Sequence, residues 1–488
     1  MSEFRRQHWA AAVDKLFGAI KQNFITFLII AFVGTRQSDG GYFMYVLYAT
    51  IALTFFSGIG SWYRFRFRVF EGELQIKKGI FVRKNIFMSR ERIQVIDLTE
   101  GLVQRIFGLV KVEVKTAGGG TESATINAIT FEEAEELKRA LRTDKTVIEG
   151  EAVSDSDEAY VEEDEFIDEW KISTKELVMA AFTSGNFGLI ASILGALSGQ
   201  MDAVINDQSI EYVKNSLPGL NNVTLIITVV IAILVISWTF SFLGVIFSYS
   251  DFSVKKTEKE LLIRSGLIER KHITIPFDRI QAVRFIEGVL RQPLGCGMLY
   301  VESAGFEQNV KERSIVLVPF ISKAKMQDFF DRFLTDFHIP ELDVTPPKKS
   351  FFRYLRRPNY LLLIAAPIAW YFWELGWLLF LLMIPATILG FLRYNDAGLH
   401  FDSKMIAMQF RNFNRKTAFI RRKRVQVIEE STNPFQARKN LSSLTVTAAS
   451  GAKGIGFSIN DLRSDDVSRI REWLISGETD YVTSPTES

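Results

Sequence analysis

The sequence predicts a membrane protein in which α-helical hairpins alternate with three small domains of the α+β class. Two observations lead to this prediction. A motif that reads R-I-Q or R-V-Q opens three similar segments, at Arg92, Arg279 and Arg424, and a pair of apolar stretches precedes each segment. Because a chain of 488 residues has room for about three domains of roughly 150 residues, the number of copies agrees with the length.

Six apolar stretches are candidates for membrane-spanning helices. The clearest, residues 223–247, has no charged residue and exceeds the roughly 20 residues that a helix needs to cross a bilayer. The stretches form three pairs, which are 23–34 with 42–60, 177–197 with 223–247, and 359–373 with 375–392. The shorter ones are also compatible with core helices of a soluble domain, so four spans is the alternative count.

Lys and Arg residues cluster outside these pairs, as at Arg64, Arg66 and Arg68, and are nearly absent from the loops inside them. Because positively charged flanks stay on the cytoplasmic side, we expect a multi-pass protein of the cell membrane with both termini and all three copies in the cytoplasm. The N-terminal segment is expected to be an interfacial helix, because its apolar residues form one stripe. The stripe contains Trp9, Val13, Leu16, Phe17 and Ile20.

Each copy has the pattern of short strands followed by one helix. In the first copy Val112 and Val114 alternate with charged residues, as in a half-buried strand. Thr130 and Glu133 then form the capping box that opens an amphipathic helix, and segments from Ser322 and Arg463 occupy the same place in the other copies. Each copy is therefore predicted to hold antiparallel strands closed by a C-terminal helix.

The segment RIQVIDLTEGLVQRIFGLVKVEVKTAGG, from Arg92, resembles the signature of the second type of bacterial pleckstrin-homology-like (PH-like) domain. Three such units on three hairpins resemble the YdbT family of bacterial membrane proteins. The resemblance implies that each copy is a bent β barrel closed by a C-terminal helix. It also implies a smaller membrane partner with a single PH-like domain, and a role in resistance to membrane-active antimicrobial peptides.

The expected organisation follows from these segments. An interfacial segment, a polar tail, an acidic linker and a second linker surround the hairpins and the PH-like domains. The boundaries are 1–22 for the interfacial segment, 23–60, 176–248 and 358–392 for the transmembrane hairpins, 62–145, 249–338 and 393–476 for the PH-like domains, 146–171 for the acidic linker, 339–357 for the second linker, and 477–488 for the tail.

An Arg-Lys pair stands nine and eight residues before the arginine of each motif, and the third copy adds a run of four basic residues. The functional hypothesis is a basic rim that binds anionic lipid headgroups, with a gain of roughly 1 kcal/mol per charge. The alternative is solvated strand charges that discourage edge pairing. The candidate residues are Arg83, Lys84, Arg270, Lys271, Arg415, Lys416, Arg421, Arg422, Lys423 and Arg424.

Other classes of function find little support in the sequence. A net charge of +2 argues against a nucleic-acid partner, and one cysteine with four scattered histidines gives no metal-ligand spacing. His272 is expected to be a lone surface imidazole, and the motif glutamines are expected to bond to the neighbouring turn. No phosphate-binding loop or nucleophile elbow is present.

We therefore expect a non-enzymatic scaffold without cofactors, which binds membrane lipids or a membrane partner and assembles as a hetero- or homo-oligomer. A transporter or a lipid-conducting protein that uses the six helices is the alternative. Uncharged spans favour anchors over a pump.

Overall fold

The computed structural model describes residues 3–18, 40–80, 82–116, 124–141, 166–184, 222–303, 314–448 and 454–476. Within these ranges the chain forms three successive repeats of the same design. Each repeat has three antiparallel strands, a single turn of 3-10 helix, three more antiparallel strands and a closing α-helix, and the second repeat has one additional strand, β7, at its start. The first turn of the closing helix in the first repeat has the predicted capping box, because Thr130 and Glu133 exchange backbone-to-side-chain hydrogen bonds of 3.2 Å.

The bounds of the elements are as follows. The first repeat comprises β1 (Arg66–Phe70), β2 (Glu73–Lys78), β3 (Lys84–Ser89), η1 (Arg90–Arg92), β4 (Ile93–Glu100), α3 (Leu102–Ile106), β5 (Leu109–Thr116), β6 (Ala124–Thr130) and α4 (Phe131–Leu141). The second comprises β7 (Asp168–Lys171), β8 (Ser253–Lys256), β9 (Glu260–Ser265), β10 (Arg270–Pro276), η2 (Phe277–Arg279), β11 (Ile280–Glu287), β12 (Cys296–Ser303), β13 (Ser314–Ser322) and α10 (Lys323–Phe333). The third comprises β14 (Gly398–Phe401), β15 (Met405–Arg411), β16 (Arg415–Arg421), η6 (Arg422–Arg424), β17 (Val425–Ser431), α14 (Pro434–Ala437), β18 (Leu441–Ala448), β19 (Ile455–Arg463) and α15 (Ser464–Ser476).

The sheets run across the boundaries between repeats. The last three strands of the first repeat join the strands of the second in the order β6-β5-β4-β10-β9-β8-β7. The second and third repeats join in the same way, in the order β13-β12-β11-β16-β15-β14. In the described residues the structure therefore shows open sheets shared by neighbouring repeats, where the family resemblance implied a bent β barrel closed by a C-terminal helix in each copy.

The hydrophobic cores are shared as well. The core of the second repeat contains Met405, Ala407 and Phe419, which belong to the third repeat, and the core of the third contains Ala282 of the second. Phe419 is 1% exposed, and its ring meets the ring of Phe330 in α10 edge-on at 5.3 Å between centroids. Because side chains cross the boundary in both directions, the second and third repeats form one packed unit.

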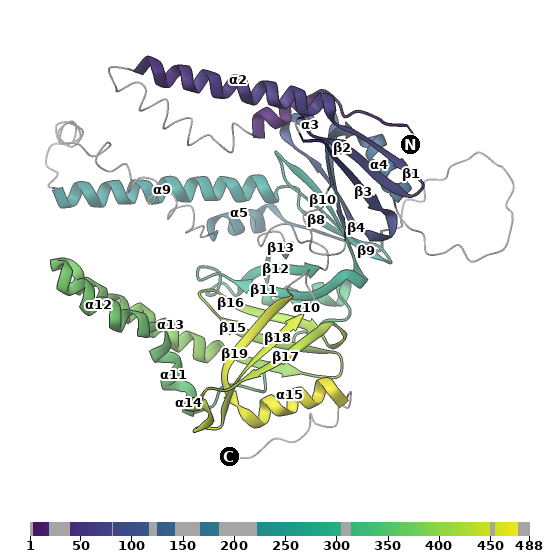
Figure 1. Ribbon diagram of the computed structural model, residues 1–488. Helices are drawn as coiled ribbons and strands as arrows, with labels where there is room; N and C mark the ends of the chain where they lie inside the picture. The colour runs from purple at the N-terminus through teal and green to yellow at the C-terminus, as the bar shows by residue number, and fades with distance from the viewer. Residues whose placement is uncertain are drawn as a thin grey trace.

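The apolar helices project from the same side of the stacked sheets (Figure 1). They are α2 (Gly40–Arg64), α5 (Thr174–Phe182), α9 (Asn222–Tyr249), α12 (Tyr360–Phe372) and α13 (Met383–Asp396), with η3 (Lys348–Ser350), α11 (Phe351–Arg356), η4 (Arg357–Asn359) and η5 (Glu374–Leu382) beside the last two. Among the described residues one stretch, Leu375–Asp396, meets the length and hydropathy of a membrane span, with a mean hydropathy of 2.3. Leu234–Tyr249 is a shorter apolar helix. The predicted stretch 23–34 and most of 177–197 lie outside the described residues.

Two of the predicted linkers contain regular structure. The end of the acidic linker forms β7, which pairs with β8, and the second linker contains α11 and a β-bridge between Val344 and Leu399. The charged residues of these segments are typical of a solvated linker, and they therefore gave no signal for a strand or a helix. Pairing with other parts of the fold stabilises β7, and packing against the third repeat stabilises α11. At the N-terminus residues 10–18 are helical, and Trp9 and Phe17 are about half exposed at 49% and 50%. Ile20, the last residue of the predicted stripe, lies outside the described residues, and the interfacial position of this segment stays a prediction.

Candidate functional site at the junctions between repeats

The junction between the second and third repeats is an antiparallel pairing of β11 with β16. The register places Glu287 opposite Arg415, Phe285 opposite Thr417 and Val283 opposite Phe419. Since side chains alternate along a strand, Glu287 and Phe285 lie on one face together with Val283. That face points into the shared core, so the carboxylate of Glu287 is buried at its end.

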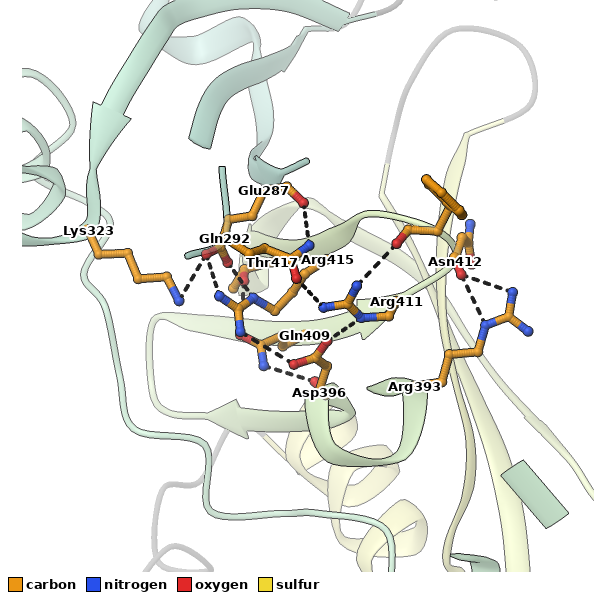
Figure 2. Close-up of polar contacts among 11 residues, drawn as sticks. Glu287, Gln292, Lys323, Arg393, Asp396, Gln409, Arg411, Asn412, Arg415 and Thr417 are labelled. Atoms are coloured by element: carbon orange, nitrogen blue, oxygen red, sulfur yellow. Dashed lines mark hydrogen bonds and ion pairs between the residues drawn. The ribbon is translucent and has the colours of Figure 1, made fainter. Parts of the chain in front are cut away.

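Glu287 is the centre of a buried ionic network (Figure 2). Its side chain is 0% exposed and accepts a hydrogen bond of 2.6 Å from Nε of Arg415, while Nζ of Lys323 lies 3.2 Å away. Asp396, the last residue of α13, pairs with Arg411 and lies 3.4 Å from Nη1 of Arg415. The network therefore links the apolar helix α13 to the sheets of both repeats.

The hydrogen bond to Glu287 raises the pKa of the Arg415 guanidinium, so this side chain is held in its charged form. Gln292 completes the network, because its amide donates to the Glu287 carbonyl at 2.9 Å and accepts from Nη2 of Arg411 at 2.6 Å. Buried charges that are paired and hydrogen-bonded in this way specify one register of the two strands.

The junction between the first and second repeats uses the same register. β4 pairs with β10 so that Glu100 lies opposite Arg270 and Leu98 opposite His272. Nε2 of His272 lies 3.3 Å from Oε1 of Glu100, which corrects the prediction of a lone surface imidazole. Burial lowers the pKa of His272, and the carboxylate of Glu100 opposes this shift.

A glutamate therefore stands eight residues after the motif arginine in the first two repeats, and an arginine stands nine residues before the next motif arginine. The two residues face each other at both junctions, as Glu100 with Arg270 and Glu287 with Arg415. These glutamates recur at a constant distance from the motif in the sequence. Their partners follow only from the pairing of strands between neighbouring repeats, which the sequence pattern does not give. The motif glutamine of the second repeat bonds as predicted, since Gln281 donates to the Arg279 carbonyl at 3.1 Å.

Several of the ten predicted lipid-binding residues contact the protein at these junctions. Arg421 donates to Asp336 at 2.7 Å and to the Phe277 carbonyl at 3.1 Å, and Arg424 donates to the Asp278 carbonyl. Burial lowers the pKa of Lys416, with the nearby charge of Arg284 acting in the same direction.

The other candidates lie at the first junction, against the closing helix of the third repeat, or on the surface. Lys271 lies 3.8 Å from Glu269, and Arg422 stacks over the ring of Trp473 at 5.4 Å. Arg83, Lys84 and Lys423 are exposed, and within the described part of the chain none of these three has a side-chain hydrogen bond or ion pair. Lipid binding by the ten residues stays a prediction.

Each repeat also ties its helical segment to a bulge in its last strand. In the first repeat Asn127 donates its backbone N–H to Gln7 at 3.0 Å, and in the third Tyr354 donates to the Asn460 carbonyl at 2.6 Å. In the second repeat Arg291, 5% exposed, donates to the Pro319 carbonyl at the bulge of β13 at 3.1 Å, and to the Ala180 carbonyl and Thr183 Oγ1 of the α5 segment, both at 3.0 Å. The helices are thus fixed to the sheets at equivalent places.

No group of three or more potential metal ligands occurs among the described residues. A groove of about 1120 Å³ lies beside the first junction, at the base of α5 and α9. Its lining mixes acidic and basic side chains, including Glu135, Lys138, Glu169 and Lys171. Such a mixture does not select for one sign of ligand charge.

Three tandem sheet repeats, each attached to an apolar helical segment, define a membrane-associated protein built on a PH-like repeat. The model of the bacterial PH domain family matches residues 20–145, 210–335 and 360–477. The chain is 31% identical over 490 residues to the transmembrane protein YdbT of Bacillus subtilis (strain 168), a match that covers 97% of this chain and 98% of that protein. The chain therefore belongs to the bacterial PH domain family, and the resemblance stated from the sequence is confirmed.

Proposed function

We propose that the protein is a non-enzymatic scaffold, anchored by three transmembrane hairpins, whose three cytoplasmic repeats bind a membrane partner protein or anionic lipid. The observation that carries the proposal is the arrangement of the apolar helices, which leave the stacked sheets on the same side (Figure 1). Because the sheets are continuous across both junctions, the three repeats are held at fixed positions relative to these helices. Such a unit presents three domains to one face of a bilayer at high effective concentration.

The topology is tested with reporters fused after Thr116, Ser303 and Ala448, one in each repeat. The expected result is cytoplasmic activity for all three fusions, with both termini also cytoplasmic. A periplasmic or extracellular signal from any one of them contradicts the proposal, because the continuous sheets require a common side. Cysteine labelling of intact cells at the same positions gives an independent measurement.

Lipid binding is tested at the exposed basic residues Arg83, Lys84 and Lys423. Replacing all three by glutamine removes three charges, and at roughly 1 kcal/mol each the affinity of the purified full-length protein for anionic vesicles is expected to fall roughly 100-fold. Vesicles of zwitterionic lipid are the control, and their binding should not change. Unchanged affinity for the anionic vesicles would remove lipid from the proposal and leave the partner protein.

The role in resistance to membrane-active antimicrobial peptides rests on the resemblance to the YdbT family. Its test is the growth of a deletion strain at increasing peptide concentrations, with the full-length gene restored as the control. A strain that grows equally well without the gene contradicts this role but not the scaffold.

A further inference from the structure

The stack of sheets ends in an edge strand at each end of the chain. In the first repeat the order is β1-β2-β3, and the outer edge of β1 is covered by the N-terminal segment through a bridge between Arg5 and Phe67. Within the described residues β3 pairs with β2 alone. The equivalent strands β10 and β16 both pair with the preceding repeat, so β3 occupies a docking position that no described strand of this chain fills.

β3 and the residue before it carry the same docking side chains as β16. The sequence Arg83-Lys84-Asn85-Ile86-Phe87 stands at the same distance from its motif as Arg415-Lys416-Thr417-Ala418-Phe419. At the junction Arg415 pairs with buried Glu287, and Phe419 is packed against Phe330 in the core of the neighbouring repeat. In the first repeat Arg83 is exposed and Phe87 is 58% exposed. An arginine and a phenylalanine four residues apart lie on one face of a strand, so both are presented together.

We infer that the β3 edge of the first repeat is the docking strand for a PH-like domain of another polypeptide, which pairs in the register of β11 with β16. The occupant is recognised by two features of the second repeat. It has a glutamate eight residues after its motif arginine, to meet Arg83, and an aromatic or apolar residue at the eighth position of its closing helix, where the second repeat has Phe330, to cover Phe87. This inference names the partner surface of the proposed scaffold and rests on that function.

A second copy of this chain does not have these features at its free edge. The position eight residues after Arg424 is Thr432, which has no charge to offer to Arg83. The eighth residue of α15 is Arg471, where α10 has Phe330. Head-to-tail joining of β3 with β17 would therefore leave Arg83 without a carboxylate and Phe87 without an apolar cover. The geometry favours a domain from a different chain.

The test places a photoreactive phenylalanine analogue, p-benzoylphenylalanine, at position 87 of the full-length protein in its native membranes. Phe87 is on the surface, so the change leaves the core intact. The matched control is the same analogue at Phe70, which is 38% exposed at the end of β1 in the same sheet. After irradiation the crosslinked peptides are identified by mass spectrometry.

The expected crosslink joins position 87 to the closing helix of a PH-like domain on another chain that has the specified glutamate. Adding Arg83→Glu should reduce its yield at least about tenfold, because a like charge would face that glutamate, and changing the partner's glutamate to arginine should restore it. A crosslink to β17 or α15 of a second copy, to lipid alone, to an unrelated protein, or no crosslink at all overturns the inference. If the inference fails while the three reporters remain cytoplasmic, the scaffold proposal still stands.

Discussion

Replacement of Glu287 by glutamine tests whether the buried network holds the second and third repeats together. The substitution keeps the shape of the side chain but removes a charge that is 0% exposed and bonded to Arg415 at 2.6 Å. Removing one partner of a buried ion pair costs about 3–5 kcal/mol. Because Arg415 keeps a second carboxylate, Asp396, at 3.4 Å, we expect the lower end, about 3 kcal/mol.

The assay is thermal unfolding of the full-length protein in detergent. For a cooperative unit of about 150–250 residues each kcal/mol lowers Tm by about 2–4 °C, so Glu287→Gln should lower it by about 6–12 °C. The control is Asp168→Asn, which removes the pair with Arg332 on the surface and should cost at most about 1 kcal/mol. A change at Glu287 no larger than the control would refute the reasoning. The double variant Glu287→Gln/Arg415→Met should lose less stability than the sum of the two single changes.

Three further predictions concern single positions. Gly266→Ala should destabilise the second repeat by at least about 1–3 kcal/mol, because φ at this glycine is +106° and the new Cβ would lie 2.0 Å from the Glu269 carbonyl oxygen. The control is Gly288→Ala, which has open space at its Cβ and should leave Tm unchanged in the same melting assay. Burial lowers the pKa of His272 below the ordinary histidine value of 6.5, so the folded state binds the proton less readily than the unfolded chain. Tm should therefore fall as the pH drops below about 6.5, and His272→Gln should flatten this dependence. Arg291→Met should release α5 from the sheet, because Arg291 donates to the Ala180 carbonyl of this helix. The single cysteine, Cys296, is 8% exposed and packs against Ala180, so its alkylation rate should rise. An unchanged rate would show that α5 is held by other contacts.

The internal design of each repeat could be predicted from the sequence because it depends on local patterns. Alternation around Val112 and Val114 gave the strand β5, in which both side chains are fully buried, and the Thr130 capping box gave the start of α4. Apolar length alone gave α9. These signals are local because side-chain direction repeats every two residues in a strand and hydrogen bonds repeat every turn in a helix.

The sharing of sheets between repeats could not be predicted in the same way. The strand β4 pairs with β10, which lies more than 150 residues later in the chain. The alternation of side chains in β4 predicts which face is buried but not which strand lies beside it. The recurring spacing of the Arg-Lys pairs predicts a basic rim, but it does not state which residues lie opposite them. Glu100 and Glu287 also recur at a constant distance from the motif, and they face Arg270 and Arg415 only because strands of neighbouring repeats pair.

The two ends of the stack differ in a way that gives the array a direction. A repeat array needs a terminal unit with a polar outer face, and β17 has exposed Gln426, Glu429 and Glu430 along its free edge, with Val427 as the apolar exception. β3 instead presents Phe87, the counterpart of a side chain that is buried at the second junction. Charges on an edge strand oppose further pairing, while an exposed aromatic beside an exposed arginine that has no ion pair among the described residues favours it. Since only the N-terminal edge retains both residues that dock β16, growth of the stack by another PH-like domain is expected at the first repeat and opposed at the third.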